Sequence, residues 1–504
     1  MLVYYGILLS VSLYFVKRWV NARRIGPRPP GPPPLPVLGN LLNLPKEKQW
    51  ETFQKWAQTY GDIVSLSVVG RTMILLNSRQ EAIEMLEGKG NLYSDRPSIP
   101  ILEFMGWTNS PALAQSKSQA WKQGRKFFHQ LFGTNAFVAR FNSVQERETR
   151  QFLLRMLEDS DDLSGNIRTT MVAIIMRIAY GYHVKSVDDP FVRSAEQALE
   201  DFSNVTAPGK FLVNLIPALK HMPGWAPGGG FKRLLPGWVK TVSDTVEKPH
   251  SFVKRQMALG IAEDSTTSRL LEENGGDSID LETELSIKWI GTTMYLAAAD
   301  TSTISIKAFF MAMTLFPECQ KKAQAELDAV VGRSRLPDCT DRDSLPYVHA
   351  LVLEVMRCHT AIPLGFPHTV SEDNIYKGYY IPRDSMIMPN IWAMTHDPVV
   401  HPDPMTFNPE RFLSSAGHSP EPDPRHVIFG FGRRICPGRL LADTSVFLSC
   451  AMTLSVFDIS PHMENGTPVL PVMDHMSGTI SHPPPFKCTI RPRSEAAVAL
   501  IHAS

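Results

Sequence analysis

Apolar residues recur along this chain mainly at helical spacing. Steps of three and four residues predict helices in several long stretches. These stretches are 117–132, 145–158, 168–180, 190–204, 285–315, 318–331 and 346–358. Shorter apolar runs predict a strand hairpin over 62–76, turning at Gly70-Arg71, and further strands within 375–392. Because no repeat or low-complexity linker divides this part of the chain, the pattern predicts one large, mainly α domain with a small β region, an α+β fold.

The N-terminal segment has a different pattern. Its first 16 residues carry no charged side chain, and Lys17 and Arg18 follow directly. An apolar run of about 20 residues is just long enough to span a bilayer. A cleaved signal peptide is the alternative, but it would carry its positive charge before the apolar run. We therefore expect a single transmembrane anchor helix over residues 1–20, with the rest of the chain on the cytosolic side.

Proline follows the anchor in a dense cluster. The sequence holds 40 prolines, and residues 26–36 read GPRPPGPPPLP. Proline fixes φ and favours extended backbone, so residues 21–40 are expected to form a stiff basic and proline-rich hinge. A ligand for SH3-type domains is the alternative for this tract, although it would lie only a few residues from the membrane. Residues 41–504 then make up the main domain.

Charge and cysteine content exclude several classes of protein. Lys and Arg total 51 and Asp and Glu total 50, which argues against a nucleic-acid binder. The six cysteines include no C-x-x-C pair and are too sparse for a disulfide framework. A reducing cytosol agrees with this usage. Most of these thiols are expected to be small buried apolar groups, with Cys436 as the exception.

Cys436 lies in a glycine-rich loop that suits a buried thiolate metal ligand. The loop reads FGFGRRICPG, and it contains Phe429, Gly432, Arg434 and Gly438 around the cysteine. The glycines permit unusual φ and close approach to a flat cofactor. A proline directly after the cysteine suits the first turn of a helix, whose N-terminus would lower the thiol pKa. The arginine can pair with a carboxylate.

This loop resembles the F-x-x-G-x-R-x-C-x-G signature of the cytochromes P450, with all five fixed positions matched. The resemblance extends over essentially the whole chain and implies the cytochrome P450 fold. It implies haem b as the cofactor and Cys436 as the axial ligand of its iron. Phe429, Gly432, Arg434 and Gly438 would also contact that cofactor. In this family the thiolate favours cleavage of the O–O bond.

Three charged residues match the structural motifs of the same family. Glu354 and Arg357 form its E-x-x-R pair, with the spacing of one helix face. Arg411 belongs to a PERF segment that lies between this pair and the cysteine. Taken alone, the pair would be an ordinary surface ion pair. The resemblance implies a buried triad that supports the fold.

An Asp-Thr pair stands within the longest predicted helix. Asp300 and Thr301 both prefer caps and turns, so a helix terminus is the alternative reading. By the resemblance, Thr301 would hydrogen-bond the bound oxygen and Asp300 would relay protons. Ala298 replaces the glycine that is usual in this motif, which is expected to narrow the oxygen groove.

Three further residues match contacts to the cofactor's propionates. Trp121 and Arg125 fit the family's W-x-x-x-R motif and share one helix face. His368 matches another propionate contact. A packed tryptophan beside a surface arginine, and a surface histidine, are the corresponding alternatives.

The resemblance implies a membrane-bound oxidoreductase of the endoplasmic reticulum. It would use O2 and NADPH to oxidise a lipophilic, terpenoid-like molecule in fungal secondary metabolism. Because the chain has no dinucleotide or flavin fingerprint, electrons would come from NADPH-cytochrome P450 reductase, with cytochrome b5 as a further donor. Lys122, Arg433 and Arg439 are candidates for its docking patch, although a solvated surface is the alternative.

Four regions would contact substrate by the same resemblance. They are 98–115, 202–228, 361–367 and 475–481. Two other functions stay open. The first is a reductase-independent haem-thiolate isomerase or dehydratase, against which Thr301 argues. The second is a non-catalytic haem-binding membrane protein.

Overall fold

The computed structural model describes residues 26–184, 189–206, 210–226, 228–414, 417 and 419–503. These residues form two compact units. The first combines residues up to Pro97 with Leu364–Met394, and the second combines Ser98–Pro363 with the chain from Thr395 onward. The expected anchor over 1–20 lies outside the described residues, as does the beginning of the expected hinge over 21–40.

The first unit is built on a four-stranded sheet in the order β1-β2-β6-β3. Its strands are β1 (Ile63–Val68), β2 (Arg71–Leu76), β6 (Met386–Pro389) and β3 (His368–Thr369). The predicted hairpin is confirmed, because β1 and β2 pair in antiparallel register. Val69 and Gly70 both have positive φ, as a tight two-residue hairpin turn requires, so the turn lies one residue earlier than predicted. β6 joins β2 in parallel.

The described part of the proline-rich segment is bonded to this unit. Ser65 donates its backbone N–H to the carbonyl of Pro30 at 2.9 Å, and Tyr380 donates to Pro27 at 2.8 Å. A Cβ at Gly31 would lie 2.1 Å from the carbonyl oxygen of Ser65, so only glycine fits at this approach. Residues 27–31 therefore lie against strand backbone.

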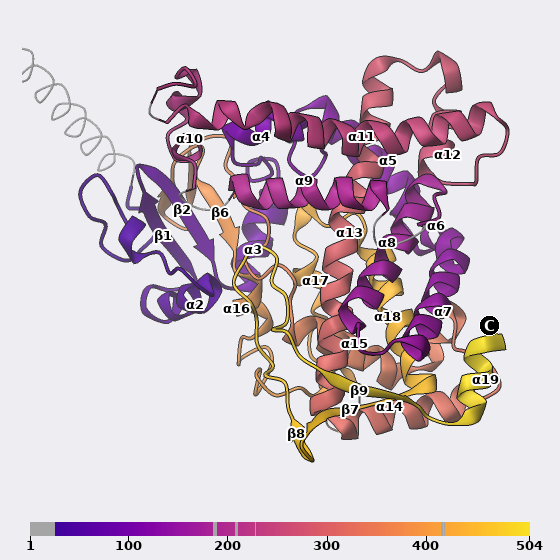
Figure 1. Cartoon of the computed structure of the whole chain (residues 1–504). Helices are drawn as coiled ribbons and strands as arrows, with labels where there is room; N and C mark the ends of the chain where they lie inside the picture. The colour runs from indigo at the N-terminus through magenta and orange to yellow at the C-terminus, as the bar shows by residue number, and fades with distance from the viewer. Residues whose placement is uncertain are drawn as a thin grey trace, which may run out of the picture. The chain divides into compact units, whose positions relative to one another are not determined.

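The second unit is mainly helical. Its longer helices are α5 (Gln119–Phe132), α7 (Asn142–Glu158), α8 (Leu163–Tyr180), α9 (Pro190–Thr206), α11 (Leu235–Ala258), α12 (Thr266–Glu273), α13 (Leu281–Leu315), α14 (Pro317–Val330), α15 (Pro346–Cys358), α18 (Arg439–Val456) and α19 (Glu495–Ala503). α13 runs through the middle of this unit and packs against α8, α5, α18 and α15 (Figure 1). The side chain of Asp280 caps α13 by accepting from two backbone N–H groups.

All seven predicted helices are present in this unit, with ends shifted by a few residues. α11 escaped prediction because Pro249 stands inside it and proline normally ends a helical pattern. A small sheet in the order β8-β7-β9 was also not predicted. Its strands are β7 (Phe457–Glu464), β8 (Thr467–Val469) and β9 (Cys488–Pro492).

Among the described residues, α18 is the one helix whose length and composition would allow it to cross a membrane. Most of its residues are buried in the second unit, as in the core helix of a globular domain. It begins at Arg439 with Gly438 as its N-cap, two residues later than the predicted start at Pro437.

Candidate functional site

The loop around Cys436 is closed by its own backbone. Cys436 donates its N–H to the carbonyl of Phe429 at 2.7 Å, and Ile435 donates to Gly432 at 3.1 Å. Gly432 has a φ of +51°, as predicted for an unusual backbone position, and Gly430 has +76°. The loop is therefore a tight turn that presents the cysteine just ahead of α18.

Gly438 departs from the expectation of an unusual φ. Its φ is −89°, which any residue can adopt. A Cβ at this position would meet no described atom within 4 Å. The glycine therefore leaves open space beside the cysteine, which is the second property that the sequence predicted for it.

The Cys436 thiol lies in the interior yet keeps part of its surface accessible. Burial raises the pKa of this thiol. The backbone N–H of Gly438 and the charges of Arg125 and Arg439 act in the opposite direction. The expected lowering of the pKa by the loop is thus present, but the effect of burial is larger. Coordination by a metal ion would release the proton.

α5 brings two of the predicted residues to this loop. Arg125 donates Nη1 to the carbonyl oxygen of Ile435 at 2.8 Å, directly before the cysteine. Trp121 lies one turn earlier on the helix and is 7% exposed. Its buried indole Nε1 has no hydrogen-bond acceptor among the described residues. Such a buried donor is costly unless a further group supplies an acceptor.

Positive charge gathers around the same indole. The guanidinium groups of Arg433 and Arg434 lie 4.8 and 5.3 Å from the centre of the Trp121 ring. Arg434 is buried and donates Nη1 to the carbonyl of Pro111 at 3.0 Å and Nη2 to Ala114 at 2.5 Å. It therefore ties the chain that leads into α5 to the cysteine loop.

The middle of α13 carries an accessible stripe although the helix is largely buried. Ala297 is exposed, and Ala298, Asp300 and Thr301 are partly exposed. The Thr301 hydroxyl donates to the carbonyl of Ala297 at 2.8 Å. Asp300 Oδ2 lies 3.3 Å from Nε2 of His482. An exposed alanine in the central helix of a unit indicates open space along that face.

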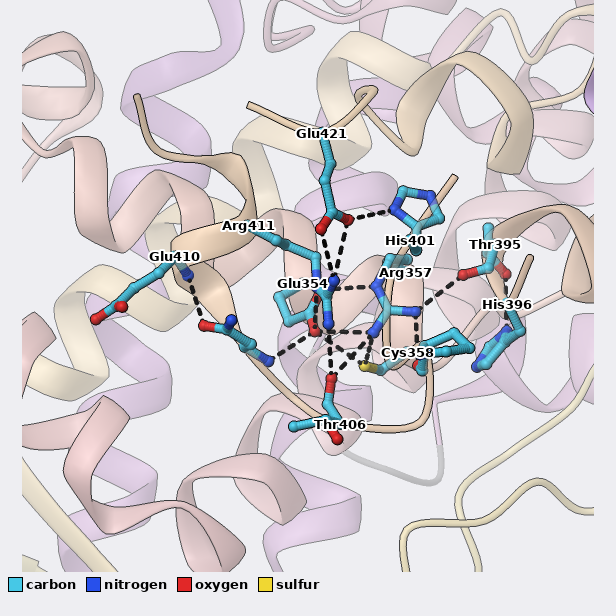
Figure 2. A network of polar contacts seen from close by, with 12 residues as sticks. Glu354, Arg357, Cys358, Thr395, His396, His401, Thr406, Glu410, Arg411 and Glu421 are labelled. Carbon is cyan, nitrogen blue, oxygen red and sulfur yellow. Dashed lines mark hydrogen bonds and ion pairs between the residues drawn. The ribbon is translucent and has the colours of Figure 1, made fainter. Parts of the chain in front are cut away.

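Glu354, Arg357 and Arg411 meet in the core of the second unit. Arg357 donates Nε to Glu354 Oε2 at 2.7 Å and Nη2 to Oε1 at 2.8 Å. Arg411 donates Nε to Glu354 Oε1 at 3.1 Å from the turn η9 (Pro409–Phe412). The three side chains are at most 3% exposed. Figure 2 shows them at the centre of a larger polar network.

Two members of that network were missed by sequence reasoning. Glu421 accepts from Nη1 of Arg411 at 2.9 and 3.0 Å, and it lies 2.7 Å from Nδ1 of His401 (Figure 2). No motif marks either residue, since both stand in irregular chain on either side of the PERF segment. One signal could have suggested Glu421. Two buried arginines need two carboxylates, and Glu354 supplies only one of them.

His368 belongs to the first unit, on β3. Its Nδ1 donates to the carbonyl of Tyr93 at 2.7 Å, and the side chain is 4% exposed. This burial differs from the surface histidine considered as its alternative. The structure brings together Trp121, Arg125, Arg434 and Cys436 within the second unit.

The cysteine site fits a flat group that carries a metal ion and acidic arms. A thiol donor, open space at Gly438, the unsatisfied indole N–H of Trp121 and the nearby guanidinium groups are what such a group requires. Trp121 and Arg125 would hold the acidic arms, and Cys436 would bind the metal.

Comparison with known proteins agrees with this chemistry. The family model for cytochrome P450 matches residues 29–490. The chain belongs to the cytochrome P450 family, whose members are haem-dependent oxidoreductases that use O2 and an electron donor.

The relatives are fungal enzymes. Cytochrome P450 monooxygenase 208 of Postia placenta is 46% identical over 99% of this chain and 96% of its own length. Cytochrome P450 monooxygenase claR of Ampulloclitocybe clavipes is 41% identical over 97% of this chain and 91% of its own length. O-methylsterigmatocystin oxidoreductase of Aspergillus flavus is 38% identical over 96% of this chain and 92% of its own length.

Proposed function

We propose that this chain is a haem b monooxygenase of fungal secondary metabolism that hydroxylates or further oxidises a lipophilic, terpenoid-like molecule. The observation that carries the proposal is the bond from Arg125 to the carbonyl of Ile435, which sets the indole N–H of Trp121 beside the Cys436 loop. When bound, haem supplies a thiolate-ligated iron that activates O2. One oxygen atom enters the substrate, and the other leaves as water with two electrons and two protons.

The residues of the chain have separate tasks in this proposal. Cys436 would supply the sulfur that binds the iron, and the Gly438 N–H would stabilise the negative charge on that sulfur. Trp121, Arg125 and Arg434 would hold the propionates, with Phe429 and Gly432 shaping the loop. Thr301 and Asp300 on the accessible face of α13 handle the protons. Glu354, Arg357 and Arg411 support the fold that holds the loop.

Aromatic side chains support a lipophilic substrate. Trp107, from the region 98–115, lies 4.9 Å from the ring of Phe202, in the region 202–228. Its other neighbour is Trp289 of α13 at 5.9 Å. Two regions expected to contact substrate thus meet through apolar rings beside α13. One of the relatives, from Aspergillus flavus, is named as an oxidoreductase of the small molecule O-methylsterigmatocystin, which supports oxidation of a small molecule by this chain.

The electron donor and the location complete the proposal. NADPH-cytochrome P450 reductase would deliver electrons, with cytochrome b5 as a second donor. Lys122 and Arg433 are exposed and Arg439 is partly exposed, as a docking patch for an acidic partner requires. Residues 1–20 would anchor the enzyme in the endoplasmic reticulum membrane, 21–40 would form the hinge, and 41–504 would form the catalytic domain on the cytosolic side.

The test begins with the carbon-monoxide difference spectrum of the reduced protein. We expect the red-shifted Soret band of thiolate ligation in the wild type and its loss in Cys436→Ala. A band typical of histidine ligation would overturn the assignment.

A second experiment tests the reaction and the substrate. Co-expression with a reductase and a panel of terpene scaffolds should yield oxidised products that require NADPH. Conversion without reductase would favour the isomerase or dehydratase, and oxidation of none of the scaffolds would overturn the terpenoid proposal. Thiolate-bound haem without any NADPH consumption in the presence of reductase would favour the non-catalytic haem protein.

A further inference from the structure

The Asp300 carboxylate has a partner from a distant part of the second unit. Its Oδ2 lies 3.3 Å from Nε2 of His482, and the two side chains are 32% and 34% exposed. Aspartate is disfavoured inside a helix because its side chain competes for backbone groups. By donating its N–H to the Asp300 carboxylate, the His482 imidazole holds that side chain away from the backbone of α13.

His482 is itself held by its loop. Its carbonyl accepts from the N–H of Met476 at 2.9 Å. The preceding Ser481 is fully buried, donates its hydroxyl to the carbonyl of Met476 at 2.8 Å and its N–H to Ala361 at 2.9 Å. Three prolines follow, and they fix φ at each position. The imidazole therefore approaches Asp300 from a stiff support.

The neighbouring imidazoles are occupied with packing. His359 and His475 stack at 4.0 Å with an interplanar angle of 9°, and His359 Nε2 donates to the carbonyl of Ser481 at 3.1 Å. Burial holds the pKa of His359 well below its ordinary value, so this ring is neutral at physiological pH. Both rings are buried, and His359 binds the loop next to His482 through the Ser481 carbonyl.

Lys307 also interacts electrostatically with Asp300. Lys307 stands two turns further along α13. Burial lowers the pKa of Lys307, and the charge of Asp300 raises it. Within the described residues, Lys307 and Asp300 form no direct ion pair. Lys307 is thus a charge at longer range, and it offers a matched control for the contact made by His482.

We propose that His482 is a positioning residue for Asp300, which ties the loop 475–482 to proton handling on α13. The proposal rests on the proposed monooxygenase function. Thr301 is the next residue to Asp300, and its hydroxyl is already oriented by its bond to Ala297. A shift of about 1 Å in such a group lowers catalytic efficiency by about 100-fold in many enzymes. Loss of the imidazole would free the carboxylate to turn toward solvent.

The consequence can be measured without knowing the substrate. Supplied with NADPH and reductase but no substrate, the enzyme reduces O2 either to hydrogen peroxide, with two electrons and two protons, or to two waters, with four of each. Correct proton delivery favours water. In His482→Leu we expect the yield of peroxide per NADPH to rise several-fold. His482→Gln keeps an N–H donor, so its yield of peroxide per NADPH is expected to be nearly that of the wild type. Lys307→Met is expected to leave this yield unchanged.

A spectroscopic readout tests the contact itself. The full-length protein with ¹⁵N-labelled histidine, in its diamagnetic carbon-monoxide form, should show a hydrogen-bonded Nε2 signal that disappears in His482→Gln. The same signal should shift in Asp300→Asn and stay in place in Lys307→Met.

The possible failures are distinguishable. Absence of the thiolate band or of NADPH consumption would contradict the proposed function. A normal band with equal peroxide yields in wild type and His482→Leu would overturn the positioning role alone. An equal rise in Lys307→Met would also overturn it, because it would assign the effect to charge at long range.

Discussion

Arg357 and Glu354 form a two-point ion pair one turn apart on α15, in which neither side chain is exposed to solvent. Arg411 adds a second buried cation to the same carboxylate, and Glu421 supplies the second anion. The two arginines and two glutamates therefore balance in charge. A balanced buried network is destabilised strongly by the loss of one member, because an uncompensated charge is left behind.

Neutralising Glu421 tests whether the stability of the fold depends on this balance of buried charges. In Glu421→Gln we expect the free energy of unfolding to fall by about 3 kcal/mol. Denaturant unfolding of the haem-loaded enzyme measures the change. The control is Lys240→Ala, which removes an exposed partner of Asp244 and should change stability by less than about 0.5 kcal/mol. Equal losses in the two variants would contradict a special role for the buried carboxylate.

Trp121→Phe should weaken retention of the cofactor. The substitution keeps an aromatic ring beside the arginines but removes the indole N–H, for which the described part of the chain offers no acceptor. A hydrogen bond to a charged group contributes about 1.5 kcal/mol or more, so haem should dissociate about tenfold faster. Transfer of haem to an excess of apomyoglobin gives the rate. Trp238→Phe is the matched control, since Trp238 lies on α11 and packs edge-on against Phe211. Similar rates in both variants would refute the proposed contact.

His349 should make the enzyme less stable in mild acid. Burial, followed by the charges of Arg342 and Arg425, lowers the pKa of His349 to about 4, against an ordinary 6.5. As pH falls below 6.5, the unfolded chain takes up a proton that the folded chain refuses. Stability is therefore lost between about pH 6.5 and 4 and levels off below that range.

His349→Asn tests this assignment. His349 Nδ1 accepts from Nε of Arg342 at 3.1 Å, and an asparagine oxygen can take over as the acceptor without titrating. We expect the variant's unfolding free energy to depend less on pH across this window. Burial also lowers the pKa values of His250, His359 and His401. These histidines should therefore maintain part of the dependence of the unfolding free energy on pH in both the wild type and the variant. An unchanged slope would mean that His349 does not contribute.

Sequence reasoning recovered what local chemistry determines. The cysteine loop, the α5 pair of Trp121 and Arg125 and the long helix α13 follow from short motifs and helical periodicity. The structure then placed Arg125 against Ile435 and Arg357 against Glu354. The spacing of Glu354 and Arg357 on one helix face had predicted the second contact. The first joins residues 310 positions apart, and no local spacing predicts it.

Contacts between distant segments could not be predicted in this way. Glu421 and His482 carry no motif, and their partners Arg411 and Asp300 are identified only when the chain has folded. The helix α11 was missed for the opposite reason, because Pro249 contradicts the local rule and tertiary packing overrides it. Of the two properties predicted for Gly438, the unusual φ is absent and the open space beside it is present.

The parallel pairing of β2 with β6 has a consequence for synthesis of the chain. Met73 pairs with Met386, so the first and longer part of the helical unit, Ser98–Pro363, leaves the ribosome between the two strands. Until then the outer edge of β2 has no partner from β6, and unpaired edges are open to association with other chains. The four-stranded sheet therefore cannot be completed until β6 has been made, and translation that stops before β6 should leave a nascent chain dependent on chaperones.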